Sequence, residues 1–333
     1  MTFLRGAGRR LIPLIAGVGI LVSLLLVVTM VGEVGNARHL LGELHWQSLV
    51  WLFPLALADH SLRFLRWHVL MKRVWPGEVR RVQGVILFSA GSLLIFTPAR
   101  AGEIAKSVYA REYLGVPLAR STPILVAERV GDVMVMAAMA GVGLLLLGEG
   151  WNLWVGGLIL GGASFMLAAG MSLLGKAARW HGPFRGRWPR LWETLQLANE
   201  SRSALLKPGA LLANIGVGLM AWSVEVLIYF VGLAALGEPV DSYLFLVALA
   251  VFPLASLAGS LSFLPGGVGA TEGSLAGLGI LIGGLASETA LVAALLSRTA
   301  ILGFVVVAGL GAAALLHLGA VPTAASGQTG SAS

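Results

Sequence analysis

Residues 97–132 read TPARAGEIAKSVYAREYLGVPLARSTPILVAERVGD, and they combine apolar runs with charges that membrane segments normally exclude. The proline at Pro98 stands four residues before the glycine at Gly102. The charges that lie among or beside the apolar runs are Arg100, Glu103, Glu128, Arg129 and Asp132. A charge at the centre of a membrane span costs about 2.5–3.5 kcal/mol unless it is paired or hydrated. A cluster of this kind therefore indicates a functional site, with a purely structural ion network as the alternative.

A second stretch near the C-terminus repeats this pattern. Residues 264–274 read LPGGVGATEGS, and Pro265 again stands four residues before a glycine, Gly269. In both stretches a glutamate is followed 26 residues later by an arginine inside an apolar run. The two pairs are Glu103 with Arg129 and Glu272 with Arg298. The repetition predicts an internal duplication in which each glutamate either contacts its arginine when the site is empty or takes up a proton in a coupled cycle.

The composition is that of an all-α integral membrane protein. Of the 333 residues 57% are hydrophobic and only 12% are charged, about half the usual charged fraction of a soluble domain. Apolar runs of about 20 residues recur, which is long enough to cross a bilayer as a helix. The net charge of +7 is explained by basic cytoplasmic loops, so no nucleic-acid partner is expected. The chain lacks cysteine and its six histidines are scattered, so we expect no disulfide, no metal and no cofactor.

The hydropathy and charge pattern predicts about six transmembrane helices plus two re-entrant helical hairpins arranged as an inverted repeat. The expected spans are residues 11–32, 48–71, 121–147, 152–174, 208–237 and 289–316. A short apolar run at 82–96 has basic residues on both sides, which indicates a hairpin that enters from the cytoplasmic face and turns at Pro98. A second hairpin, formed by 243–263 and 271–284, is expected to enter from outside. Inverted repeats with broken helices are typical of secondary transporters.

The same pattern divides the chain into five segments. They are an N-terminal helix and outer loop (1–47), a first half with the cytoplasmic hairpin (48–175), a basic cytoplasmic interfacial linker (176–208), a second half with the outer hairpin (209–318) and a disordered tail (319–333). Of the 23 lysines and arginines only Arg38 falls in a predicted outer loop. Both termini are therefore expected in the cytoplasm of a bacterial-type cell, with the chain in the inner membrane.

Three charges in the second predicted span leave two interpretations open. Asp59, Arg63 and Arg66 are spaced at i, i+4 and i+7, so they share one helical face. In the structural interpretation, Asp59 and Arg63 form a pair and Arg66 extends to the lipid headgroups. In the functional interpretation, all three belong to a polar site within the membrane.

The candidate site combines charged side chains with an irregular backbone. A guanidinium can hold a phosphate through two hydrogen bonds, and the N-terminus of a half-helix favours an anion. The candidate substrate-binding residues are Arg100, Glu103, Glu128, Arg129, Asp132, Glu272 and Arg298. The candidate backbone or hinge residues are Pro98, Gly102, Pro265, Gly266, Gly267 and Gly269. The glycines admit close approach of a ligand or a neighbouring helix, or they serve tight turns only.

The two motifs, TPARAGE followed by ERVGD and LPGGVGATEGS followed by SR, resemble those of the lysylphosphatidylglycerol synthase/flippase transmembrane-region family. The resemblance covers roughly residues 10–318, and all the candidate site residues fall on the family's motif positions. It implies a membrane region that moves lipids between leaflets. The family's full-length synthases add a soluble aminoacyl-transferase domain that these 333 residues lack, so aminoacylation is not expected. Free-standing members are linked with other lipids, which leaves a phospholipid, a polyprenyl-phosphate lipid or a hopanoid-type lipid as the partner.

These observations favour a flippase-like lipid translocase for an anionic or phosphate-bearing lipid. No nucleotide-binding loop is present, so a gradient or lipid metabolism would drive it. One alternative is an integral-membrane lipid-modifying enzyme that uses the acidic residues of the cluster in acid–base chemistry. Another is a non-catalytic accessory subunit that binds lipid-biosynthesis enzymes, and a homo-oligomer is compatible with each of the three.

Overall fold

A computed structural model of the chain describes residues 44–96, 103–148, 189–262 and 264–322, together with residues 158 and 162. Helices make up most of these residues, and no strand occurs among them. The helices are α3 (Trp46–Leu49), α4 (Leu52–Val74), α5 (Arg81–Ser92), η1 (Leu93–Phe96), α6 (Ala105–Leu114), α7 (Leu118–Leu147), α10 (Pro189–Leu205), α11 (Pro208–Ala235), α12 (Ser242–Leu261), η3 (Pro265–Gly267), α13 (Ala270–Gly283) and α14 (Ser287–His317). The predicted all-α class is confirmed for this part of the chain.

Within the described residues, four helices are long and apolar enough to cross a membrane: α7, α11, α12 and α14. Helix α4 also has the length of a span, 23 residues, but it carries several charges. Helix α12, which the sequence predicted as one arm of a re-entrant hairpin, has the length and composition of a span. The predicted spans 11–32 and 152–174 lie outside the described residues, apart from positions 158 and 162 within the second, and so does most of the predicted tail.

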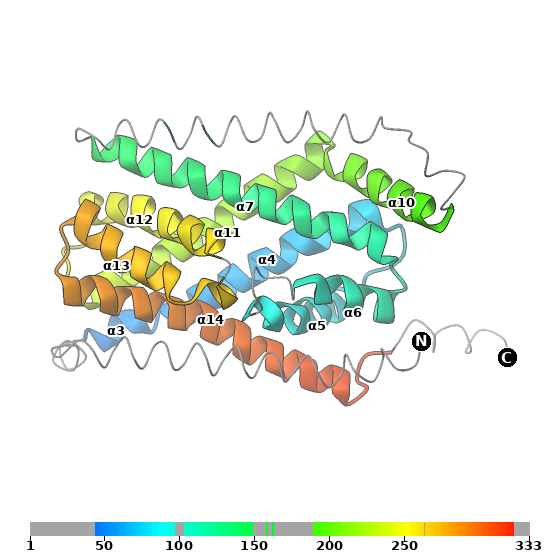
Figure 1. The fold of residues 1–333 in the computed structure, drawn as a ribbon. Helices are drawn as coiled ribbons and strands as arrows, with labels where there is room; N and C mark the ends of the chain where they lie inside the picture. The colour runs from blue at the N-terminus through cyan, green and yellow to red at the C-terminus, as the bar shows by residue number, and fades with distance from the viewer. Residues whose placement is uncertain are drawn as a thin grey trace.

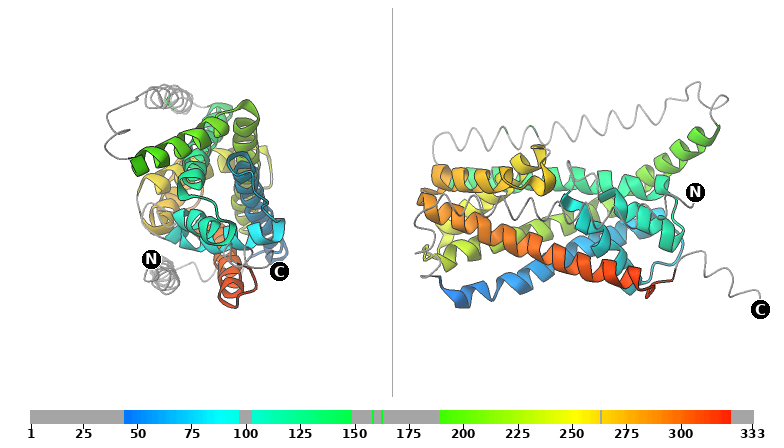
Figure 2. Two further views of the ribbon diagram at one scale, coloured as in Figure 1. Left: turned by 90° about the vertical axis from the view of Figure 1, so that its right-hand side faces the viewer. Right: turned by 60° about the horizontal axis from the view of Figure 1, so that its bottom comes forward.

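Two pairs of packed helices occupy opposite halves of the bundle. Helices α12 and α13 pack together in one half, while α5 and α6 pack together in the other (Figure 1). Helices α4, α7, α11 and α14 run past both pairs (Figures 1 and 2). The inner ends of the two pairs meet where η1 contacts η3. A Cβ added to Gly266 in η3 would lie 3.3 Å from the ring of Phe96 in η1, so the two turns are in direct contact.

Local sequence signals explain where several helices begin and how closely they pack. Pro208 occupies the first turn of α11, a position that needs no backbone N–H donor. The carboxylate of Asp241 caps α12 by accepting the N–H of Leu244 at 2.8 Å. Near its C-terminal end α7 approaches α12 so closely that a Cβ on Gly143 would lie 2.6 Å from the backbone nitrogen of Ala250. A side chain at position 143 would therefore push the two helices apart.

The buried residues form apolar layers on both sides of a polar layer. Along α4, Leu52 and Ala56 belong to one apolar cluster, and Trp67 and Leu70 belong to another. Asp59, Arg63 and Arg66 of α4 lie between these two clusters. Helix α7 repeats this order, with Ile124 on one side of its three central charges, Glu128, Arg129 and Asp132, and Val135 on the other. The charges therefore lie inside the bundle, away from its ends.

Candidate functional site

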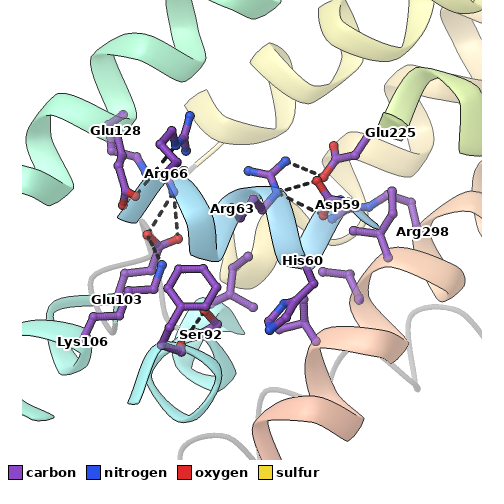
Figure 3. Close-up of a pocket in the computed structure, with 16 residues that line it drawn as sticks. Asp59, His60, Arg63, Arg66, Ser92, Glu103, Lys106, Glu128, Glu225 and Arg298 are labelled. Carbon is purple, nitrogen blue, oxygen red and sulfur yellow. Dashed lines mark hydrogen bonds and ion pairs between the residues drawn. The ribbon is translucent and has the colours of Figure 1, made fainter. Parts of the chain in front are cut away.

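Helix α4 contributes a guanidinium that two carboxylates share. Arg63 donates from Nε to Asp59, four residues earlier, with distances of 2.8 and 3.1 Å to the two carboxylate oxygens. It also donates from Nη2 to Oε1 of Glu225 on α11, at 2.6 Å. Both carboxylates are buried (Figure 3). We call Asp59, Arg63 and Glu225 the Arg63 trio.

A larger ion network joins α4, α6 and α7. Its members are Arg66, Glu103, Lys106, Glu128, Arg129 and Asp132, and we call it the Arg66 network. Arg66 donates from Nη1 to Asp132 at 2.7 Å, and its Nε lies 3.8 Å from Glu128. Arg129 donates to Glu103 at 2.9 Å and lies 3.5 Å from Asp132. The network therefore balances three basic groups against three acidic groups.

A third group lies where η3 leads into α13. Arg298 on α14 donates from Nε to Glu272 at 2.9 Å and from Nη2 to the carbonyl of Gly266 at 2.7 Å. The other carboxylate oxygen of Glu272 accepts the N–H of Gly269 at 2.6 Å. We call Arg298 and Glu272 the Arg298 pair. The pair thereby stabilises the conformation of the turn between α12 and α13.

The indole of Trp222 on α11 connects the Arg63 trio with the Arg66 network. Its Nε1 donates to Asp132 at 3.0 Å, and the guanidinium carbon of Arg63 lies 5.0 Å from its ring centroid. A cation at this distance over an aromatic face is attracted by the ring. One buried side chain therefore contacts both groups of charges.

These groups surround a cavity of about 60 Å³ between α4, α5, α6, α7, α11 and α14 (Figure 3). The charged side chains that line it are Asp59, Arg63, Arg66, Glu103, Lys106, Glu128, Arg129, Glu225 and Arg298. His60 also lines the cavity, and its Nε2 lies 2.9 Å from the hydroxyl of Ser89. The volume is enough for water, since about 10–15 Å³ of space for the centre of a water-sized sphere already admits one molecule.

Two guanidinium groups beside the cavity keep an unused donor. The buried Nε atoms of Arg66 and Arg129 have no hydrogen-bond partner. Buried polar groups are usually hydrogen-bonded, and a buried donor without a partner costs about 1–3 kcal/mol. Both arginines line the cavity, while the two Nε atoms themselves are buried behind its surface. Among the described residues, no three acidic or histidine side chains are grouped so as to hold a metal ion.

The structure places most of the predicted site residues together. The predicted contacts of Glu103 with Arg129 and of Glu272 with Arg298 are both present, and each is 2.9 Å long. Glu103, Glu128, Arg129 and Arg298 line the cavity directly, whereas Asp132 and Glu272 lie behind them as partners of the arginines. The predicted residues Pro98, Arg100 and Gly102 lie outside the described residues.

The backbone conformation after Pro265 explains why glycines occur there. Gly266, Gly267 and Gly269 all have positive φ, at 63°, 67° and 85°. Residues with a side chain avoid this conformation, so the turn between α12 and α13 by itself accounts for the three glycines. Their predicted role at a ligand or hinge stays a prediction.

One of the two interpretations of α4 is wrong in its treatment of Arg66. This side chain does not extend to the lipid headgroups, because its residue is only 2% exposed and it contacts Asp132 across to α7. The predicted pair of Asp59 and Arg63 is present, and Glu225 joins it. Sequence reasoning did not assign Glu225, Lys106, His60 or Trp222 to the site. A lone glutamate in the 28-residue apolar helix α11 was the one available signal for Glu225.

This fold and site define a class of protein: an all-helical, multi-pass membrane protein with a charged cavity inside its bundle. Residues 14–309 match the family described as the lysylphosphatidylglycerol synthase TM region. The chain belongs to this family, which confirms the resemblance seen in its two motifs. The family groups membrane proteins related to lipid modification or translocation. No curated protein and no solved structure gives a significant match to the chain.

Proposed function

We propose that the chain is a flippase-like lipid translocase for an anionic or phosphate-bearing lipid. The observation that carries this proposal is the charged cavity buried between two apolar layers of a membrane protein. Five basic side chains line it, and two of them, Arg66 and Arg129, keep an unused N–H donor. A phosphate headgroup that contacts these donors satisfies them, while its hydrocarbon tails stay in the surrounding lipid.

The headgroup route would pass the point where the two turns meet. The present cavity is too small for a phosphate headgroup with its substituents, so entry requires neighbouring segments to separate. Phe96 in η1 and Gly266 in η3 are in contact at the inner ends of the two helix pairs, and Ile95 in η1 lines the cavity. We assign the opening of the route to a separation of these turns. The Arg298 pair, which binds the carbonyl of Gly266, would hold the turn after α12 in place during that movement.

The finer architecture is part of the proposal. We propose six spans and two re-entrant hairpins in an inverted repeat, within the five segments given above. The chain would lie in the bacterial inner membrane with both termini in the cytoplasm. The positions of the two helix pairs in opposite halves of the bundle support the inverted order (Figure 1). Cysteine accessibility at single positions in the loops before α5 and after α11 tests it, because the proposal puts these loops on opposite sides.

The decisive experiment is leaflet exchange of labelled lipids in vesicles that contain the purified chain. The lipids are several phospholipids and a polyprenyl phosphate. Arg129→Ala removes a guanidinium of the cavity, and we expect it to slow exchange of the transported lipid about tenfold or more, as for the loss of a hydrogen bond to a charged group. The matched control is Arg80→Ala, since the Arg80 side chain is 77% exposed and pairs with the exposed Glu78.

Exchange of one lipid class that Arg129→Ala slows and Arg80→Ala leaves unchanged supports the proposal and identifies the substrate. Equal exchange by wild type and Arg129→Ala contradicts the assignment of the cavity. Absence of exchange for every lipid, with a correctly inserted protein, contradicts the translocase itself and favours the accessory-subunit alternative.

A further inference from the structure

The Arg63 trio differs from the other two charged groups in its balance of charge. The Arg66 network has three basic and three acidic members, and the Arg298 pair has one of each. The trio has two carboxylates, Asp59 and Glu225, and only one guanidinium. With every group ionised, the trio carries one negative charge that no described side chain offsets.

Among the residues that the structure describes, none offers the trio a further cation that lacks a carboxylate partner. The charged groups that face it from α6, α7, α13 and α14 belong to the Arg66 network or to the Arg298 pair, and each basic group among them lies within 4 Å of a carboxylate of its own. From α4 itself, His60 faces the cavity and is engaged with Ser89. Trp222 contributes a ring face to Arg63 and no charge.

Two buried carboxylates at one site are an arrangement that takes up a proton. Asp59 is 2% exposed and Glu225 is 5% exposed, and both contact the same guanidinium. Carboxylates that share a site do not both ionise readily, and protons then bind to the pair as a unit. Both line the cavity, whose volume suffices for water, so a proton has a donor close to either carboxylate. A metal ion fits less well, because no group of three or more suitable ligands exists among the described residues.

We propose that Asp59 and Glu225 together bind one proton, and that this proton is the ion coupled to lipid movement. A hydronium ion in the cavity gives its proton to a carboxylate oxygen of either residue: one O–H bond of the hydronium breaks, one O–H bond to the carboxylate forms, and a water molecule is left. The coupling part of this inference rests on the proposed function. When the phosphate of a headgroup binds Arg63, it displaces the two carboxylates from their shared cation. The headgroup and the proton therefore bind in the same step and travel in the same direction.

The first test measures proton binding without any lipid movement. The purified chain in vesicles is taken from about pH 8 to about pH 6, above the range in which exposed carboxylates titrate. Proton uptake is followed by the infrared band of the protonated carboxyl group. We expect one proton per chain for wild type and none for either Glu225→Gln or Asp59→Asn, because each change leaves one carboxylate with one guanidinium. Glu78→Gln, at a residue whose side chain is 76% exposed, is the control and keeps the wild-type uptake.

Two results overturn the proton site. One is uptake that persists in both folded variants, and the other is the absence of uptake in wild type. The two variants are independent, so a folding failure in one leaves the other as the test, and thermal unfolding in detergent shows which of them is folded. Loss of uptake in the folded variants supports the site whether or not lipid moves.

The second test measures coupling. A pH gradient across the vesicle membrane is expected to accumulate the labelled lipid in one leaflet with wild type, and Glu225→Gln is expected to exchange the lipid without accumulation. Accumulation driven by a sodium gradient instead, or the same gradient-driven accumulation with Glu225→Gln, overturns the coupling. If proton uptake follows the expected pattern but wild type exchanges no lipid, the proposed function fails while the proton site stands.

Discussion

The two glutamate–arginine pairs look alike in sequence and differ in their surroundings. Both have a spacing of 26 residues and a contact of 2.9 Å. The side chain of Arg298 is 9% exposed, and it also binds the carbonyl of Gly266. The side chain of Arg129 is 36% exposed, shares its charge with Asp132 and keeps one donor unused. Both arginines line the cavity, but one copy of the motif is built into a backbone turn, whereas the arginine of the other copy keeps a donor without a partner.

This difference leads us to expect different tasks for the two copies of the motif. An arginine that is committed to a carbonyl and a capping glutamate cannot bind a ligand without breaking a turn. An arginine whose partners have other cations can leave them at lower cost, because Glu103 retains Lys106 and Asp132 retains Arg66. We therefore expect the Arg298 pair to act in stability and Arg129 to act in binding.

The largest effect is expected from Arg298→Ala. The change leaves the carboxylate of Glu272 buried without its cation and the carbonyl of Gly266 without its donor. Breaking a buried pair in this way costs about 3–5 kcal/mol of the free energy of unfolding. Thermal unfolding in detergent measures it, and a midpoint within error of the Arg129→Ala protein would refute the comparison.

A smaller loss is expected from Gly266→Ala, which tests the turn that Arg298 supports. Gly266 has a φ of 63°, and an added methyl group would lie 3.3 Å from Phe96. The left-handed conformation costs a residue with a side chain about 1–2 kcal/mol. The same unfolding measurement checks this loss. Gly216→Ala, in a helix with no heavy atom within 4 Å of the new methyl group, is the control and should not destabilise the protein.

Trp222→Phe tests the contact of Trp222, whose ring lies against Arg63, with Asp132, a partner of Arg129. The change keeps an aromatic face under Arg63 and removes the N–H that Asp132 accepts. Hydrogen bonds to charged groups contribute about 1.5–3 kcal/mol, and Asp132 keeps Arg66, so we expect a loss near the lower end of this range. A double-mutant cycle with Asp132→Asn measures the interaction. Strict additivity of the two losses would contradict a direct link.

The smallest effect on stability is expected from Arg129→Ala, at about 1 kcal/mol or less, because the exposed side of an ion pair contributes little. The same variant is expected to have the clearest effect on lipid exchange. A stability loss as large as that of Arg298→Ala would show that Arg129 also holds the fold together.

The sequence was most informative where charges interrupt apolar runs. The repeated spacing found both glutamate–arginine pairs, because the same residue types recur 26 residues apart in the two stretches. The helix bounds followed from hydropathy and local signals, as for Pro208 at the start of α11. Hydropathy and helix-start signals depend on residues that are close together in the sequence, so they can be read without the fold.

The ion pairs that the sequence did not predict join residues that are far apart in the chain. The contact of Arg66 with Asp132 joins positions 66 apart, and that of Arg63 with Glu225 joins positions 162 apart. No periodicity relates such positions, so the second span alone could not show whether its arginines reach headgroups or partners. The roles of the candidate site residues in binding stay predictions until the exchange experiments are made.

The long separation between Arg63 and Glu225 has a consequence for synthesis. Helix α4 leaves the ribosome about 8–30 s before α11 at a rate of about 5–20 residues per second. During that interval its buried charges have no partner on α11, and each opposes entry into lipid. We therefore expect α4 to wait beside the insertion machinery until α11 emerges. Crosslinks from α4 to that machinery should be present in chains stalled before residue 225 and absent well after it; their absence at both stages would show that α4 enters lipid alone.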